Sequence, residues 1–292
     1  MSIDRLQSKI RKMKCPVVLD FQLDLSVIPA YILGEEKTVV RAFSRYAMEL
    51  MEALRDRVPA VRFHFSDFAL YGSEGVSALS AVLAYASKLG YYTLLNAPEA
   101  LSAQQAAHNA GVLLGEDCNW KFDGLVLSQF IGTDAIKPYV SRQKEGDKGL
   151  FAIVRTGNKS GPEMQDLLTG GRLVHMAQAD LVHRIAEPNL GKSGYCTLGV
   201  MASATNAASL MNLRSKFKYL FILIDGFDAA NANSKNCIGA FDKLGHGAAI
   251  CVGHCVTGAW KDDEEEGTPF AEAAQQAVER VNRNISRYIT VL

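Results

Sequence analysis

The sequence has no excess of charge of either sign and no long hydrophobic run. Its 292 residues include 31 Lys and Arg and 31 Asp and Glu, so no broad electrostatic attraction to nucleic acid or to an anionic membrane is expected. No apolar run approaches the roughly 20 residues that span a bilayer. Residues 1–14 are basic and amphipathic, and they lack the apolar core of a secretory signal. These absences predict a cytoplasmic protein with no nucleic-acid or membrane partner.

Two common site patterns are also missing. The six cysteines form no CxxC pair, so neither a disulfide framework nor a zinc site is indicated, and we expect reduced thiols, most of them in the core. No glycine-rich fingerprint follows the first apolar run, where residues 20–23 read DFQL. A doubly wound dinucleotide-binding sheet would carry that fingerprint, so this fold is the less favoured alternative.

What the sequence does contain is a regular alternation of apolar runs and helical segments. The runs are uniformly apolar, which is typical of parallel strands covered by helices. They cover residues 16–21, 60–65, 91–96, 122–128, 149–155, 194–201, 219–224 and 248–253. Helices are predicted over residues 3–13, 37–58, 76–89, 99–110, 133–143, 163–187, 205–217, 234–244 and 269–288. Eight units in about 250 residues predict an α/β fold, a single (β/α)8 TIM barrel over residues 1–292 with an extra helix at each end.

In such a barrel the functional side chains lie near the C-terminal ends of the strands. The polar candidates for a pocket there are Asp20, Arg62, His64, Asp67, Asn96, Ser128, Asp225, Asp228 and His254. Histidine and aspartate together could bind a metal, but strand ends of any barrel are polar, and no metal site is predicted. A second possibility is that the mouth is plugged by apolar side chains, namely Phe63, Leu101, Phe130 and Phe227.

Several motifs in this order resemble the orotidine 5′-phosphate decarboxylase family of the longer bacterial type. They include LD at 19–20, YGSEG at 71–75, GTDAIKP at 132–138, VRTGN at 154–158, QDL at 165–167 and AW at 259–260. The resemblance covers nearly the whole chain. It implies a (β/α)8 barrel that dimerises across the barrel mouths and removes CO2 from orotidine 5′-phosphate without a metal or an organic cofactor.

The resemblance also implies a Lys-Asp-Lys-Asp array, and this chain departs from it at every position. Arg62 stands at the first lysine, Asn96 at the first aspartate, Pro98 at the catalytic lysine and Leu101 at the second aspartate. Proline has no proton to give, and leucine cannot hold a neighbouring cation. A guanidinium is a poor general acid near neutral pH because it retains its proton. We therefore expect no catalytic residues for this reaction.

The implied phosphate positions have changed as well. Where the family carries a phosphate-binding arginine after the eighth strand, residues 253–255 read GHC, and the loop after the seventh strand carries Asp225 and Asp228. The main hypothesis is a degenerate, non-catalytic homologue that forms a homodimer or pairs with an active paralogue. The first alternative is an enzyme or binder that uses a rebuilt pocket at the barrel mouth for another small molecule. The second is a genuine decarboxylase of UMP biosynthesis.

Overall fold

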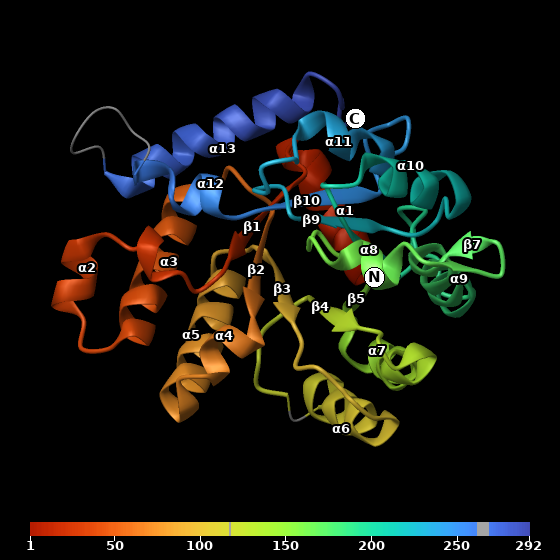
Figure 1. The fold of residues 1–292 in the computed structure, drawn as a ribbon. Coiled ribbons are helices and arrows are strands. Elements are labelled where there is room, and N and C mark those ends of the chain that lie inside the picture. The colour runs from red at the N-terminus through yellow and green to blue at the C-terminus, as the bar shows by residue number, and fades with distance from the viewer. Residues whose placement is uncertain (117, 262–268) are drawn as a thin grey trace.

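Eight parallel strands close into a barrel in the computed structural model, which describes residues 1–116, 118–261 and 269–292. The strands follow the order β1-β10-β9-β8-β5-β4-β3-β2, so that β1 and β10 complete the ring (Figure 1). Their bounds are Val17–Phe21 for β1, Ala60–His64 for β2, Tyr92–Asn96 for β3, Gly124–Ser128 for β4, Gly149–Arg155 for β5, Leu198–Ser203 for β8, Ile222–Asp225 for β9 and Ala248–Val252 for β10. The predicted barrel is confirmed, and each predicted run contains or overlaps one strand.

Helices surround the barrel and confirm the extra helix at each end. The longer ones are α1 (Ser2–Met13), α3 (Val39–Leu54), α5 (Gly72–Lys88), α6 (Ala103–Leu114), α7 (Lys137–Gly146), α9 (Val174–Ala186), α10 (Ala207–Lys216) and α13 (Phe270–Ser286). The shorter ones are α2 (Ala30–Glu35), α4 (Phe65–Ala69), α8 (Gly161–Gln165), α11 (Ser234–Cys237) and α12 (His254–Thr257). In Figure 1, α13 runs past α12 toward α11.

The prediction of one long helical region over residues 163–187 is wrong. The structure has α8, then a two-stranded hairpin of β6 (Leu168–Thr169) and β7 (Arg172–Leu173), and then α9. Gly170 and Gly171 form the turn with φ of 56° and 78°. A two-residue hairpin turn with positive φ at both positions matches the twist of the flanking strands, and glycine adopts that conformation without a steric penalty. The Gly-Gly pair therefore interrupts the helical pattern.

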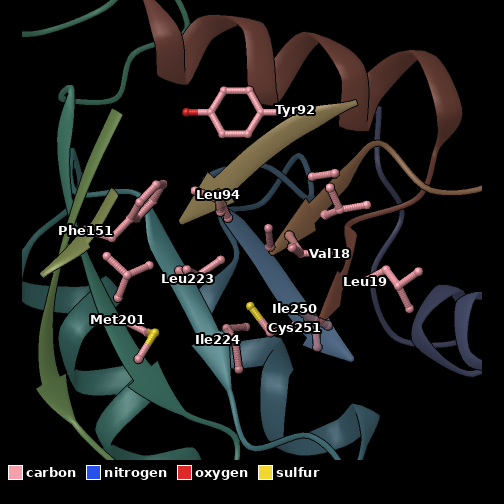
Figure 2. Packing of buried hydrophobic residues seen from close by; sticks show 14 of the residues in the cluster. Val18, Leu19, Tyr92, Leu94, Phe151, Met201, Leu223, Ile224, Ile250 and Cys251 are labelled. Atoms are coloured by element: carbon pink, nitrogen blue, oxygen red, sulfur yellow. The ribbon is translucent and has the colours of Figure 1, made fainter. Parts of the chain in front are cut away.

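Large side chains fill the barrel interior below the mouth. Tyr92, Leu94 and Phe151 come from β3 and β5 and are fully buried (Figure 2). The Tyr92 ring fits because β4 and β5 both begin with glycine. A Cβ atom added at Gly124 would lie 3.0 Å from the Tyr92 hydroxyl, and one added at Gly149 would lie 2.6 Å from it. This packing closes the lower part of the barrel, so a ligand can enter only from the ends of the strands where the chain leaves the sheet.

The N-terminal helix α1 covers the opposite end of the barrel. The Ser2 hydroxyl lies 2.7 Å from the Tyr92 hydroxyl and donates to the Asp123 carbonyl. Arg5 forms ion pairs with Asp123 and Asp147 beside this contact. In the described part of the chain, no helix is both long and apolar enough to cross a bilayer. The charged run at 261–266, which the sequence predicts to be a solvated loop, lies outside the described residues except for Lys261. The single-domain boundary of 1–292 stays a prediction.

Candidate functional site

Strand register brings together the polar residues at the ends of β1, β2 and β3. Asp20 on β1 pairs with Arg62 on β2, and His64 on β2 pairs with Asn96 on β3. Side chains two residues apart on a strand point to the same face, so Arg62 and His64 both face the barrel interior. Phe63, between them, faces the helices and stacks on Phe21 with ring centroids 5.0 Å apart. The alternation therefore places charge inside the mouth and aromatic rings outside the sheet.

The buried Arg62 forms ion pairs with two aspartates, of which Asp20 is buried and Asp225 is partly exposed. Its Nε and Nη2 atoms each donate to one carboxylate oxygen of Asp20 at 2.6 Å, which is the two-pronged geometry that suits a guanidinium. Nη2 also donates to Asp225 Oδ1 at 2.7 Å. Arg62 is 1% exposed and Asp20 is 4% exposed. Because Arg62 and Asp20 are both buried, removing either of them would leave an uncompensated charge in the interior, which strongly destabilises the fold.

The protonation states of the pair follow from its surroundings. Burial alone would raise the pKa of Asp20, but the positive charge of Arg62 and the contact with His64 hold that pKa well below its usual range. Burial alone would lower the pKa of Arg62, but Asp20 and Asp225 raise it well above its usual value. Arg62 therefore keeps its proton, and Asp20 stays ionised, so neither group can exchange a proton with a substrate near neutral pH.

His64 and Asn96 extend the same hydrogen-bonded chain. The amide nitrogen of Asn96 donates to His64 Nδ1 at 2.8 Å. With Nδ1 accepting, the ring proton lies on Nε2, which donates to Asp20 Oδ1 at 2.9 Å. Gln22 donates to the other Asp20 oxygen at 3.2 Å. Asp20 thus accepts hydrogen bonds from the side chains of Arg62, His64 and Gln22. Within the described ranges, no group of three His, Cys, Asp or Glu side chains is placed to hold a metal ion.

A cavity of about 160 Å³ lies beside this network, at the ends of β1, β9 and β10. It is lined by Asp20, Gln22, Asp24, Val27, Asp225, Gly226, Asp228, Cys251, Gly253, His254 and Thr257. Four of these side chains are carboxylates, and neither a lysine nor an arginine of the described residues lines the cavity. Sites for small ligands usually enclose about 300–1,000 Å³. The cavity is therefore both small and acidic, which disfavours a bulky anion.

Asp228 organises the loop that borders the cavity. Its two carboxylate oxygens accept the backbone N–H groups of Gly253 at 2.7 Å and Cys255 at 3.0 Å, at the start of α12. Negative charge is favourable at the first turn of a helix, where backbone N–H groups lack partners. A Cβ atom added at Gly253 would lie 3.2 Å from Asp228 Oδ2, so glycine allows this close approach. His254 follows directly and lines the cavity.

Four other predicted positions lie apart from this cavity. Asp67 on α4 accepts the backbone N–H of Leu23 at 3.0 Å and does not line the cavity. Ser128 lines a separate, larger cavity beside β4 and β5. Pro98 lies in the loop after β3, where its carbonyl accepts from the Asn109 amide at 3.5 Å. Leu101 lies in the same loop and is 74% exposed. The array positions after β3 therefore place no charged side chain into the charged network.

The suggested apolar plug is wrong for three of its four members. Phe63 lies outside the sheet, while Leu101 and Phe130 are exposed rather than packed into the mouth. Phe227 is partly buried against the core. Ion pairs, not apolar side chains, close this side of the barrel. The reason is that Arg62 points into the barrel and Phe63 points away from it. The sequence alone does not show which of these two neighbours points inward.

Sequence reasoning missed several residues of the network. Gln22 is two residues beyond Asp20, a spacing that could have indicated the same face. The Met201 sulfur accepts from Arg62 Nη1 at 3.3 Å. Cys251 is buried and lines the cavity, and burial raises the pKa of its thiol well above the usual value, so it is not a thiolate. These apolar and sulfur-containing residues resemble ordinary core positions, and no local pattern distinguishes them.

A second cluster has the arrangement of a catalytic triad but not its accessibility. His175 Nε2 lies 3.1 Å from the Ser209 hydroxyl, and His175 Nδ1 lies 3.1 Å from Asp166 Oδ1. His175 is fully buried and Ser209 is 3% exposed. Asp166 is also held by two hydrogen bonds from Arg155, each of 2.9 Å. The cluster therefore joins α8, α9 and α10 to the barrel, and its histidine and serine are buried away from any substrate.

Comparison with known proteins identifies the family that this chain resembles. Over 286 residues it is 25% identical to an orotidine 5′-phosphate decarboxylase of Clostridium novyi (strain NT), covering 98% of each chain. It is 26% identical over 244 residues to the enzyme of that name from Rhodopirellula baltica, covering 82% of this chain and 79% of the relative. No profile of a protein family matches.

Solved structures agree on the fold. An orotidine 5′-monophosphate decarboxylase of Plasmodium berghei superposes with a TM-score of 0.79 at 14% identity, covering 99% of this chain and 98% of that one. The OMP decarboxylase of Leishmania donovani superposes with a TM-score of 0.73 at 21% identity, covering 97% of this chain and 98% of that one. The predicted resemblance to the orotidine 5′-phosphate decarboxylase family is thus confirmed over nearly the whole chain, with the same barrel fold.

Proposed function

We propose that this chain is an orotidine 5′-phosphate decarboxylase-like protein that does not carry out the decarboxylation. The observation that carries the proposal is the pairing of the buried Arg62 with Asp20, which is also buried, and with the partly exposed Asp225. In this pairing, the charged side chains that β1, β2 and β9 contribute to the barrel mouth bind one another and not a ligand. A decarboxylation that leaves a carbanion needs a nearby cation that can both stabilise the charge and deliver a proton.

Proton delivery is the first requirement that the mouth does not meet. Arg62 holds its proton too tightly, because two carboxylates raise its pKa well above the usual value. Pro98 stands where the resemblance implies the catalytic lysine, and no lysine lines either cavity of the barrel mouth in the described part of the chain. A positioned general acid commonly contributes 10²–10⁴-fold in rate, and preorganised charge contributes about as much. The loss of both supports an inactive protein.

Phosphate recognition is the second requirement that the barrel mouth does not meet. The small cavity carries the carboxylates of Asp20, Asp24, Asp225 and Asp228, and no lysine or arginine of the described residues lines it. A phosphate monoester dianion is usually held by arginine or by backbone N–H groups at a helix start. Here Asp228 already accepts two N–H groups at the start of α12, those of Gly253 and Cys255. Like charges and occupied donors both oppose binding of a nucleotide phosphate.

Assembly and location belong to the same proposal. A cytoplasmic homodimer, or a pair with an active paralogue, is supported by the resemblance and by large apolar side chains exposed beyond the strand ends. Leu70 after β2 is 86% exposed and Leu101 after β3 is 74% exposed. Burial of apolar area of this kind is the usual driving force for subunit contact. A rebuilt pocket for another small molecule is an alternative role, supported by the cavity beside Asp20 and His254.

A genuine decarboxylase of UMP biosynthesis is the second candidate function. Its support is the set of relatives that carry this name and match along 98% of both chains in the Clostridium novyi case. Retention of Asp20 at the end of β1 also favours it. This candidate requires that a group other than those of the Lys-Asp-Lys-Asp positions supplies the proton. The two candidates therefore differ in a single measurable property, the release of CO2.

The deciding experiment is a CO2-release assay on purified protein with orotidine 5′-phosphate. The proposal predicts no turnover above the uncatalysed rate, and a known active enzyme added to the same mixture must turn over normally. Turnover that disappears in Asp20→Asn, while that variant remains folded by circular dichroism, would overturn the proposal and establish the decarboxylase. Turnover that is equal in Asp20→Asn and the unaltered chain would indicate a contaminating enzyme and leave the proposal standing.

A further inference from the structure

A second, larger cavity lies on the other side of the barrel mouth. It encloses about 530 Å³ between the ends of β4 and β5 and the helices α8 and α9. Its lining consists of Glu99, Ser128, Gln129, Phe130, Ile153, Val154, Thr156, Met164, Gln165, Leu167, Val174 and Gln178. This volume lies within the range of about 300–1,000 Å³ that is typical of small-molecule sites. It is about three times the volume of the acidic cavity beside Asp20.

Large apolar side chains at the rim of this cavity are exposed. Phe130 is 77% exposed, Met164 is 59% exposed and Leu167 is 53% exposed. They come from three separate segments, after β4, on α8 and before the β6–β7 hairpin. Single exposed apolar residues are ordinary on a surface, but their gathering around one concave site is typical of a binding site. Covering them would remove apolar area from water, which favours an apolar ligand.

The polar lining groups divide into those that hold the wall and those that remain available. Gln165 Oε1 accepts the Thr156 backbone N–H at 2.9 Å, and Gln129 Nε2 donates to the Ile153 carbonyl at 3.3 Å. These bonds fix the wall. Within the described ranges, the side chains of Ser128 and Gln178 have no hydrogen-bond partner in the protein. One hydroxyl and one amide are thus available to a ligand.

The cavity also selects by charge. Among the described residues, Glu99 is the one charged side chain that lines the cavity, and it lies in the loop after β3. Arg155, at the end of β5, does not line the cavity and is paired with Asp166. An anion would therefore lose hydration without meeting a cation, which costs free energy. A neutral ligand avoids that cost.

We propose that this cavity binds an uncharged, mainly apolar molecule that carries a hydrogen-bonding group for Ser128 or Gln178. Apolar contacts with Phe130, Met164 and Leu167 supply most of the affinity, and the polar pair orients the ligand. The site goes beyond the function proposed above, because it uses none of the groups of the Asp20 and Arg62 network. A chain that decarboxylates and a chain that does not would both possess it.

The test uses two fluorescent probes with the same ring system. N-phenyl-1-naphthylamine is neutral, and 8-anilino-1-naphthalenesulfonate adds a sulfonate. The proposal predicts saturable binding of one neutral probe per chain. Binding of the sulfonate should be at least about tenfold weaker, because no lysine or arginine of the described residues lines the cavity. Uridine 5′-phosphate should not displace the neutral probe. Equal affinity for the two probes, or displacement by the nucleotide, would overturn the proposal.

Substitutions in and away from the cavity test whether the neutral probe binds there. Gln178→Trp on α9 fills the cavity from its wall and should reduce the affinity for the neutral probe by at least about tenfold. Gln104→Trp adds the same ring at an exposed glutamine on α6 that does not line the cavity, so binding should be unchanged. If Gln178→Trp does not fold, Phe130→Ser tests the same site from its exposed rim. Unchanged binding in a folded variant of either kind would contradict the assignment.

Discussion

The two sides of the barrel mouth differ in what closes them. Beside β1, β2, β9 and β10, Arg62 joins Asp20 and Asp225, and the remaining cavity is about 160 Å³ and acidic. Beside β4 and β5, the cavity is about 530 Å³, has an apolar rim and is lined by one charged side chain of the described residues, Glu99. Buried charges must pair, and pairing fixes the side chains that carry them. The side closed by ion pairs is therefore structural, and the side beside β4 and β5 remains free to bind.

The largest expected effect comes from removing the guanidinium of the charged side. Arg62→Met leaves Asp20 buried without its partner, which should lower the free energy of unfolding by about 3–5 kcal/mol. Urea denaturation followed by circular dichroism measures the loss. Arg41→Met is the matched control, since Arg41 pairs with Glu74 on the surface and such pairs contribute about 0–1 kcal/mol. Equal losses in the two variants would show that the mouth network is not structural.

The same pair predicts the direction of the pH dependence. The folded-state pKa of Asp20 lies well below its usual range, and the unfolded value is about 3.9. The stabilisation is therefore complete above the unfolded pKa and is lost as pH falls from there toward the folded pKa. Thermal unfolding between pH 7 and pH 3 should show a steeper decline for the unaltered chain than for a double variant, Asp20→Leu with Arg62→Met. Parallel curves would argue against an ionised, paired Asp20.

An intermediate effect is expected at the hairpin that follows α8. Gly171 has φ of 78°, so Gly171→Ala should destabilise the fold by about 1–2 kcal/mol. Because Leu167 immediately precedes this hairpin, the neutral probe should also bind more weakly. Gly111→Ala on α6 provides a control of opposite sign, since its new Cβ atom meets nothing within 4 Å and the change should stabilise by about 0.5–1 kcal/mol. Differential scanning fluorimetry on both variants checks the contrast.

The smallest effect on stability is expected at the rim of the larger cavity. Phe130 is largely exposed, so Phe130→Ser should change the free energy of unfolding by less than about 0.5 kcal/mol. The same substitution should weaken binding of the neutral probe several-fold because it removes apolar contact area. Urea denaturation and probe titration on one sample separate the two quantities. A large loss of stability with unchanged probe binding would reverse the roles assigned to the two sides.

The sequence is sufficient to predict the barrel because each buried strand is a short apolar run with a helical segment after it. It also places Asp20, Arg62, His64 and Asn96 near the ends of parallel strands, and the strand register pairs Asp20 with Arg62 and His64 with Asn96. It fails at 163–187, where the helical pattern outweighed the turn chemistry of Gly170 and Gly171. Turn residues act locally and override a pattern that extends over many residues.

The candidate site is less predictable than the fold, for a physical reason. Sequence gives the residues near a strand end, but only register and the inward or outward direction decide which of them meet. Asp67 contacts a backbone N–H after β1, and Ser128 lines the other cavity. The ion pair itself depends on atoms that lie 42 and 163 positions apart in the chain. Residues this far apart in the sequence form no local pattern from which their contact could be predicted.

Calorimetric titration with uridine 5′-phosphate tests the central claim most directly. The claim is that the charged side of the mouth is closed by its own ion pairs and repels a phosphate dianion. The prediction is no saturable heat with millimolar nucleotide, while Arg62→Met and the unaltered chain behave alike. Saturable binding of one nucleotide per chain with micromolar affinity would contradict the claim, and its loss in Asp20→Asn would place the nucleotide in the cavity that we describe as closed to it.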